Sequence, residues 1–147
     1  MHTIARSLLS VGTPLVAVCL GHQVLAAQLG LSITRKSEPA QGVRADVTLG
    51  GRRFSVGFYN SYAAVSPGDI LDSPLVGRPV QLTRDPASGI VHALAGPGIR
   101  SAQFHVESVL TEHGPDLLRD LLAGALTDRN SGGRAARSGE DARLTLR

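Results

Sequence analysis

The sequence predicts an α/β fold, with an open, mostly parallel sheet and helices on both of its faces. Residues 15–18, Leu-Val-Ala-Val, form a continuous apolar run, which is typical of a strand buried on both faces of a parallel sheet. A helical pattern over residues 21–29 follows almost at once, and Gly30 is a usual residue just past a helix end. A second, leucine-rich helix is predicted from Pro115 to Leu126, with proline in its first turn.

Shorter elements are expected around and between these two helices. Residues 2–10 have the pattern of an amphipathic helix, which Gly12-Thr13-Pro14 ends. Strands bounded by turn residues are expected at 31–35, 45–49, 53–58, 80–83, 90–95 and 99–104. Gly50-Gly51 suits a hairpin turn, so the first three of these strands are predicted to form a β-meander.

The second helix marks the end of the predicted domain. Its inner face is expected to carry five leucines, Leu117, Leu118, Leu121, Leu122 and Leu126. After Thr127 the apolar periodicity stops, and glycine, serine, arginine and alanine dominate. We therefore predict one domain over residues 1–126 and a disordered tail over residues 127–147.

Composition limits the classes of function. A hydrophobic content of 42% in 147 residues is enough for one buried core. The net charge of +3 is not gathered into a basic stripe, so no nucleic-acid partner is expected. Pro14, His22 and Gln23 interrupt the apolar stretch over residues 8–31, so no membrane span is expected. A single cysteine excludes an internal disulfide and suits a reducing compartment, and we expect a cytoplasmic protein.

That cysteine, Cys19, lies between the first predicted strand and its helix, with Gly21 as the turn residue. A sharp strand-to-helix turn holds its central side chain out at the carboxyl edge of a sheet, and it needs small neighbours such as Gly21 and Ala17. The helix N-terminus is expected to favour the thiolate, and the backbone N–H of Leu20 is placed to donate to an oxyanion. A lone cysteine after an apolar run is more often a small buried residue, but this context indicates a nucleophile.

Residues 103–108, Gln-Phe-His-Val-Glu-Ser, offer a base for this nucleophile. Side chains two residues apart point the same way on an extended segment, so Glu107 can orient the imidazole of His105. Taken alone, His105 would suit a core histidine and Glu107 a surface carboxylate. Their joint occurrence after an apolar strand favours a triad of Cys19, His105 and Glu107.

The two segments together, residues 18–23 (Val-Cys-Leu-Gly-His-Gln) and 103–108, strongly resemble the motifs G-x-C-x-G-x-Q and F-H-P-E-S of class I glutamine amidotransferases. The resemblance covers about residues 10–126. It implies that the amide of L-glutamine is hydrolysed at Cys19, with no cofactor in the glutaminase domain. It also implies that Gln23 contacts the amide side of this substrate.

Two further segments depart from the family pattern. Ser61 and Tyr62 match the Ser-Leu of the family's H-S-L element, whose backbone holds the α-amino and α-carboxyl ends of glutamine, but Asn60 replaces the histidine. Residues 40–42, Ala-Gln-Gly, stand where many members have H-G-K at the interface with a synthase. Together with residues 57–60, these departures resemble the amidotransferase part of phenazine-pathway aminodeoxyisochorismate synthases, relatives of anthranilate synthase. The resemblance therefore implies a partner synthase, or synthase domain, that binds chorismate and uses Mg²⁺.

Family members open with a further βαβ portion, and its P-G-x-P-like loop supplies a second oxyanion donor. This sequence starts after that portion, so we expect an N-terminally truncated domain. We expect residues 1–147 alone to be poorly soluble or self-associating, with negligible glutaminase activity, because the strand at residues 15–18 would lack a neighbour.

Alternatives to this interpretation remain. The chain could be a catalytically inactive remnant that binds a synthase, or the glutaminase half of another class I enzyme such as aminodeoxychorismate synthase. A cysteine-dependent α/β hydrolase unrelated to glutamine would share the elbow but leave Gln23 unexplained. His22 and His113 are predicted to be structural, and no set of side chains has the spacing of a metal site.

Overall fold

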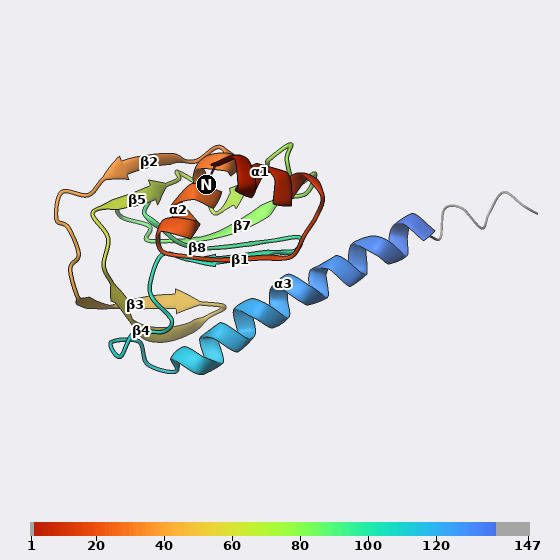
Figure 1. Cartoon of the computed structure of the whole chain (residues 1–147). Coiled ribbons are helices and arrows are strands. Elements are labelled where there is room, and N and C mark those ends of the chain that lie inside the picture. The colour runs from red at the N-terminus through yellow and green to blue at the C-terminus, as the bar shows by residue number, and fades with distance from the viewer. Residues whose placement is uncertain (1, 138–147) are drawn as a thin grey trace, which may run out of the picture.

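A computed structural model describes residues 2–137 and shows a central sheet with other elements packed on both faces (Figure 1). The elements in chain order are α1 (His2–Ser10), β1 (Leu15–Val18), α2 (Leu20–Leu29), β2 (Ser32–Arg35), β3 (Val43–Leu49), β4 (Arg52–Phe58), β5 (Tyr62–Val65), β6 (Ile70–Leu71), β7 (Val80–Arg84), β8 (Val91–Gly96), β9 (Ile99–Ala102) and α3 (Gly114–Arg137). The predicted α/β class, an open sheet with flanking helices, is confirmed.

The central sheet has five strands in the order β1-β9-β8-β7-β6. β1 and β9 are parallel, with Val18 opposite Ala102, whereas the pairs β9-β8, β8-β7 and β7-β6 are antiparallel. The loops that join β6 to β9 along the chain are too short for the crossover that parallel neighbours need. Within the described residues the sheet therefore has less parallel pairing than the sequence predicts.

The other four strands form two separate antiparallel ribbons. β3 pairs with β4 through the predicted turn, in which Gly50 and Gly51 have φ values of 55° and 81°. β2 pairs instead with β5, and no strand is predicted at residues 62–65. The predicted meander is therefore wrong, because residues 36–42 lead the chain away from β2 before β3 begins.

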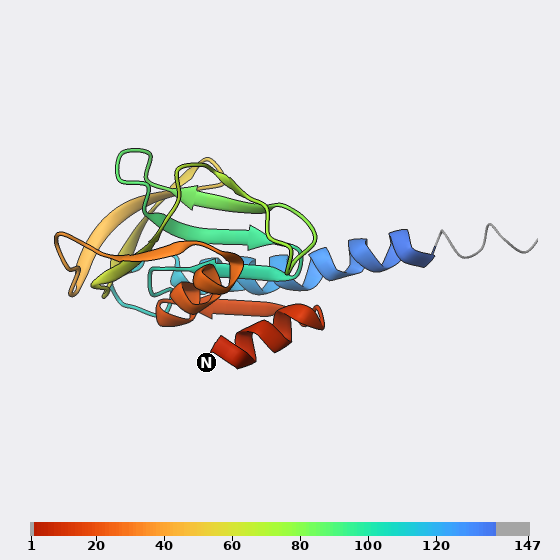
Figure 2. The same ribbon diagram turned by 90° about the horizontal axis from the view of Figure 1, so that it is seen from above.

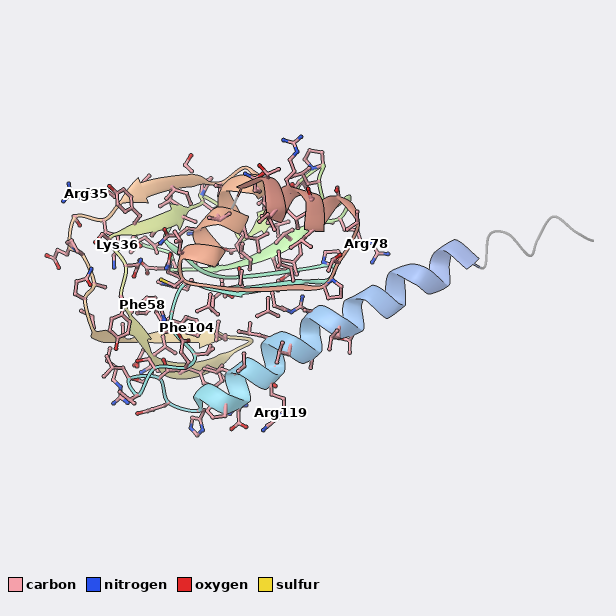
Figure 3. All side chains as sticks on the ribbon, in the orientation of Figure 1. Arg35, Lys36, Phe58, Arg78, Phe104 and Arg119 are labelled. Atoms are coloured by element: carbon pink, nitrogen blue, oxygen red, sulfur yellow. The ribbon has the colours of Figure 1, made fainter. Side chains whose placement is uncertain are left out.

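Two hydrophobic clusters, one on each face of the sheet, hold the layers together. In the first, Leu25 of α2 packs with Ile99 of β9. In the second, Phe58 of β4 and Leu117 of α3 pack with Phe104, which follows β9. The rings of Phe58 and Phe104 meet edge to face with centroids 6.1 Å apart, between the β3-β4 hairpin and the sheet (Figure 3). This packing fixes the segment just beyond β9 against the sheet.

β1 lies at the edge of the sheet, next to α1 (Figure 2). The sequence predicts a central strand here, but all four residues of β1 are half-buried. Apolar side chains of α1, β1 and α2, including Ile4, Leu15 and Val24, line a groove along this edge. Among the described strands, β9 alone therefore sets the position of β1 in the sheet.

Helix α3 is longer and less buried than the sequence predicts. Leu117 and Ala125 are buried and Leu121 packs against the second cluster, so the inner face follows a spacing of four residues. Three leucines predicted to be inward, Leu118, Leu122 and Leu126, are exposed instead. The helix continues through residues 127–137, beyond the predicted end at Leu126. Residues 138–147 lie outside the described residues.

His22 links the first turn of α2 to the sheet. Its side chain is fully buried, with Nδ1 2.8 Å from Ser101 Oγ and Nε2 3.2 Å from the Val91 carbonyl oxygen. Burial lowers the pKa of His22 to about 4, so the imidazole is neutral at pH 7. The prediction that His22 is structural is confirmed.

We expect the free energy of unfolding to fall as the pH drops from 6.5 towards 4. In the unfolded chain His22 takes up its proton at the ordinary pKa of 6.5, whereas in the folded chain it resists protonation down to about 4. At pH 4.5 this group alone removes about 2–3 kcal/mol of the stability present at pH 7. Urea unfolding at both pH values measures the loss.

The variant His22→Gln should lose less stability between pH 7 and pH 4.5 than the unaltered chain. Burial also lowers the pKa of His92, which adds to the loss in the same direction but is present in both proteins. The comparison therefore isolates His22, and an equal loss in both proteins would contradict this prediction.

Candidate active site

Cys19 forms the turn between β1 and α2. Its backbone has φ 52° and ψ −108°, a conformation that residues with a side chain rarely adopt. The Cys19 N–H donates to the Ala102 carbonyl oxygen at 2.8 Å, and the Cys19 carbonyl accepts the first helical hydrogen bond from Gln23 N–H at 3.1 Å. A Cβ on Gly21 would lie 3.4 Å from Ala17 Cβ, so strand and helix pass at van der Waals distance. The predicted elbow is present.

His105 and Glu107 follow β9, the parallel partner of β1, at the same edge of the sheet. His105 Nδ1 lies 2.6 Å from Glu107 Oε1, and the rings of His105 and Tyr59 are nearly perpendicular, with centroids 5.2 Å apart. The side chain of His105 is 25% exposed and that of Glu107 63% exposed. The two side chains are in contact, as expected, but the expected extended segment is wrong. Val106 and Glu107 lie in a turn in which Ser108 N–H donates to the His105 carbonyl oxygen at 3.2 Å.

The backbone of His105 is held by the end of β4. His105 N–H donates to the Gly57 carbonyl oxygen at 3.0 Å, and Gly57 N–H donates to Thr111 Oγ1 at 3.0 Å. A Cβ on Gly57 would lie 2.8 Å from Leu110 Cβ and 3.1 Å from Ser108 Oγ. Real Cβ atoms essentially never approach a neighbour at 2.8 Å. The loop of residues 105–111 can therefore pack this closely on β4 only if residue 57 is glycine.

The electrostatics of Cys19 differ from the expectation. Burial and the nearby Glu107 carboxylate raise the pKa of the thiol, and they outweigh a hydrogen bond from Leu20 N–H that lowers it. The expectation that the helix N-terminus makes Cys19 a thiolate is therefore wrong for the resting site. Partial burial acts to raise the pKa of Glu107 as well, but the hydrogen bond with His105 and the Glu107 backbone N–H bring it below its ordinary value.

The residues expected to bind substrate adjoin this cysteine. Leu20 N–H faces the sulfur, as its effect on the thiol pKa shows. Gln23 Nε2 donates to the Tyr62 carbonyl oxygen at 2.8 Å, so the first turn of α2 is tied to the start of β5. Ser61 Oγ accepts a hydrogen bond from Gln41 Nε2 at 3.4 Å. The arrangement brings all four residues of the predicted binding set into one connected region, and their contacts with substrate stay a prediction.

Gln103 belongs to this site, and the sequence analysis gives it no role. Its side chain is fully buried, its Oε1 accepts from Gln23 Nε2 at 3.0 Å, and its Nε2 lies 3.8 Å from Cys19 Sγ. Gln103 lies in a bend directly after β9, which ends at Ala102, so the two-residue alternation of a strand does not place its side chain. The residues before it include Arg100 and Ser101, and a further polar residue in this run carried no distinct signal.

Within the described residues, no group of three or more histidine, cysteine, aspartate or glutamate side chains is placed to hold a metal ion. None of the helices in that part of the chain is both long and apolar enough to cross a bilayer.

The elbow cysteine and the histidine–carboxylate pair at one sheet edge define an α/β protein of the nucleophile-elbow class. The family model "Glutamine amidotransferase class-I" matches residues 1–125. The chain belongs to that family.

Its relatives include curated proteins named as anthranilate synthases. The phenazine-specific anthranilate synthase of Pseudomonas chlororaphis is 50% identical over 126 residues, which are 86% of this chain and 20% of that protein. Anthranilate synthase component 2 of Archaeoglobus fulgidus is 31% identical over 119 residues, which cover 76% of this chain and 61% of that protein. The chain thus spans about a fifth of the first relative and about three fifths of the second.

A solved structure from Thermoplasma acidophilum, assigned to GMP synthase, has a TM-score of 0.64 and 19% sequence identity to this chain. The match covers 89% of this chain and 66% of that one. At this identity the likeness shows the fold alone, and the fold agrees with the family.

We predict that Cys19→Gly is more stable than Cys19→Ala. Both variants lack the sulfur, but alanine keeps the Cβ that makes φ 52° unfavourable, at a cost of about 1–3 kcal/mol. Glycine avoids this cost, but it also makes the unfolded chain more flexible, which lowers the stability of the Gly variant by up to about 1 kcal/mol. Urea unfolding should therefore show Cys19→Gly ahead by about 1 kcal/mol, and an advantage for Cys19→Ala would count against strain at the elbow.

We also predict that Gly57→Ala lowers the free energy of unfolding by about 1–3 kcal/mol, because the new methyl group overpacks the loop that carries His105. Gly68→Ala is the matched control, since a Cβ there meets nothing within 4 Å. Thermal unfolding of the two variants measures the difference. Equal stability of the two variants would contradict the prediction, because it would show that the loop of residues 105–111 can move to accommodate the methyl group.

Proposed function

We propose that this chain is the glutaminase portion of a chorismate-using synthase, in which it releases ammonia from L-glutamine. The observation that carries the proposal is that the Cys19 elbow and the His105–Glu107 pair follow the parallel strands β1 and β9 at the same edge of the sheet, in a chain of the class-I amidotransferase family. The 50% identity to a phenazine-specific anthranilate synthase favours an anthranilate or aminodeoxyisochorismate synthase over aminodeoxychorismate synthase, whose component 2 from Klebsiella aerogenes is 28% identical.

The reaction begins at the sulfur. Because the pKa of Cys19 is raised, the thiol holds its proton at neutral pH, and attack on the glutamine side-chain carbonyl needs a base. His105 takes that proton at Nε2, since Nδ1 is bonded to Glu107. A C–S bond forms, the carbonyl oxygen becomes an oxyanion, and Leu20 N–H donates to it.

The second half of the reaction returns the proton. His105 protonates the departing amide nitrogen, the C–N bond breaks, and ammonia leaves a glutamyl thioester on Cys19. His105 then activates a water molecule, which attacks the thioester to give glutamate and the free thiol. Glu107 holds the tautomer throughout and stabilises the imidazolium whenever it forms.

Ammonia is the useful product, so an acceptor site on the synthase must receive it. The synthase, on a separate chain or in another part of the same one, would bind chorismate and use Mg²⁺, and the glutaminase portion would need no cofactor. A cytoplasmic location follows from the same proposal, because glutamine and the acceptor are both metabolites of that compartment.

The proposal is tested with 6-diazo-5-oxo-norleucine, a glutamine analogue that alkylates glutaminase cysteines. We expect it to label Cys19 when residues 1–147 are supplied with the N-terminal βαβ portion that family members have. Peptide mass mapping can show this, because residues 1–147 contain one cysteine. L-glutamine should protect Cys19 from the reagent, whereas L-asparagine should not. Labelling that glutamine leaves unchanged would instead support the inactive, partner-binding alternative.

The same assay separates the roles within the triad. His105→Ala should slow labelling by about 100-fold or more, since a general base typically contributes that much. Glu107→Gln should slow it less, because the carboxylate acts through the histidine. Unchanged labelling of His105→Ala would make the triad assignment wrong.

A further inference from the structure

The amide of Gln103 lies between two residues of the site. Its Nε2 is 3.8 Å from Cys19 Sγ, a distance suited to a hydrogen bond to sulfur, and its Oε1 accepts from Gln23 Nε2 at 3.0 Å. Gln23 Nε2 also donates to the Tyr62 carbonyl oxygen at 2.8 Å. The buried Gln103 side chain therefore connects the nucleophile, on the β1-α2 turn, to the start of β5.

These hydrogen bonds determine how the oxygen and the NH₂ group of the Gln23 and Gln103 side chains are oriented. Gln23 faces the Tyr62 carbonyl oxygen, which can only accept, so Gln23 must present its NH₂ group there, and the same nitrogen lies 3.0 Å from the amide of Gln103. Gln103 must then turn its own oxygen to Gln23, which leaves its NH₂ group toward the sulfur of Cys19. A flipped Gln103 would set two NH₂ groups against each other inside the protein, at the cost of an unsatisfied buried amide.

We propose that Gln103 is a positioning residue of the Cys19 site, whose amide donates to the sulfur and so supports the thiolate that forms during attack. The inference deepens the proposed function, because it assigns a role beside the same nucleophile. Gln103 and Leu20 N–H then form two neutral donors around Cys19 Sγ. A donor to a thiolate favours the ionised sulfur and opposes the effects of burial and of Glu107.

Other titratable groups near the sulfur do not replace this donor. Glu107 disfavours the thiolate, and His105 on the same segment is bonded through Nδ1 to Glu107. His22 on α2 directs both ring nitrogens away, to Ser101 and to the Val91 carbonyl. These groups are common to every variant proposed below, so a shift in the titration of Cys19 reports on residue 103.

The test is the pH dependence of Cys19 alkylation by iodoacetamide in the full chain, a reagent that does not need a glutamine pocket. Gln103→Met keeps the length of the side chain but lacks the donor, and Gln103→Glu keeps an acceptor for Gln23 while placing a carboxylate near the sulfur. Gln81→Met is the matched control, because Gln81 is an exposed residue of β7.

We expect the half-titration pH of Cys19 to rise by about half a pH unit or more in Gln103→Met, which slows alkylation at pH 7 by about threefold or more. Gln103→Glu should shift it further, and Gln81→Met should match the unaltered chain. A profile for folded Gln103→Met that superimposes on that of the unaltered chain would overturn the inference. Circular dichroism establishes which variants fold.

If neither Gln103→Met nor Gln103→Glu folds, a measurement on the unaltered chain tests whether Gln103 donates to the sulfur of Cys19. The ¹⁵N resonance of the Gln103 side-chain amide should follow the Cys19 titration, and that of Gln81 should not; a Gln103 resonance that stays constant through the titration overturns the inference. Protection by L-glutamine distinguishes this inference from the proposed function. A shifted Gln103→Met profile without such protection would support the role of Gln103 and contradict the glutaminase activity.

Discussion

The parallel pairing of β1 with β9 is the constraint on which the site depends. Val18 lies opposite Ala102, and Cys19 N–H donates to the Ala102 carbonyl oxygen at 2.8 Å. This register brings together residues as far apart in the chain as Cys19 and Gln103, 84 positions from one another. Because parallel strands end at the same edge of a sheet, Cys19 and His105, the proposed nucleophile and base, follow their strands at that one edge. A shift of one residue would turn the side chains that follow β9 to the opposite face.

The layers on the two faces of the sheet hold that register. Leu25 of α2 packs with Ile99 of β9 on one face, and Phe104 packs under the β3-β4 hairpin on the other. His22 adds a polar link from α2 to Ser101 of β9. The strained backbone of Cys19 persists because these contacts determine where both its strand and its helix must lie.

The sequence was informative where local chemistry sets the structure. The elbow could be predicted because an apolar run ends at Cys19 and a helical pattern starts within two residues. The contact between His105 and Glu107 was also expected, although a turn rather than an extended segment brings the two side chains together. The hairpin turn at Gly50-Gly51 is local in the same way. Function was predictable to the extent that two separated motifs occur in the right order.

Features that depend on distant partners were not predictable. β5 pairs with β2, although the β3-β4 hairpin lies between them in the chain. The sequence of a strand does not indicate which other strand it pairs with. Leu118 and Leu122 are apolar and were therefore expected to be buried. Both are exposed, because the hairpin and the sheet cover only the side of α3 that carries Leu117. The low exposure of Gln103 likewise arises from elements that meet only in the folded chain.

The raised pKa of Cys19 connects the fold to the order of events in the reaction. A buried thiol beside a carboxylate holds its proton at rest, so the site does not maintain a permanently charged sulfur. In the reaction proposed above, ionisation has to coincide with attack, when His105 would accept the proton and Glu107 would stabilise the resulting imidazolium. Glu107 would then have two opposed effects, since it disfavours the lone thiolate and favours a thiolate–imidazolium pair. The proposal therefore implies that the sulfur loses its proton as it attacks the substrate carbonyl.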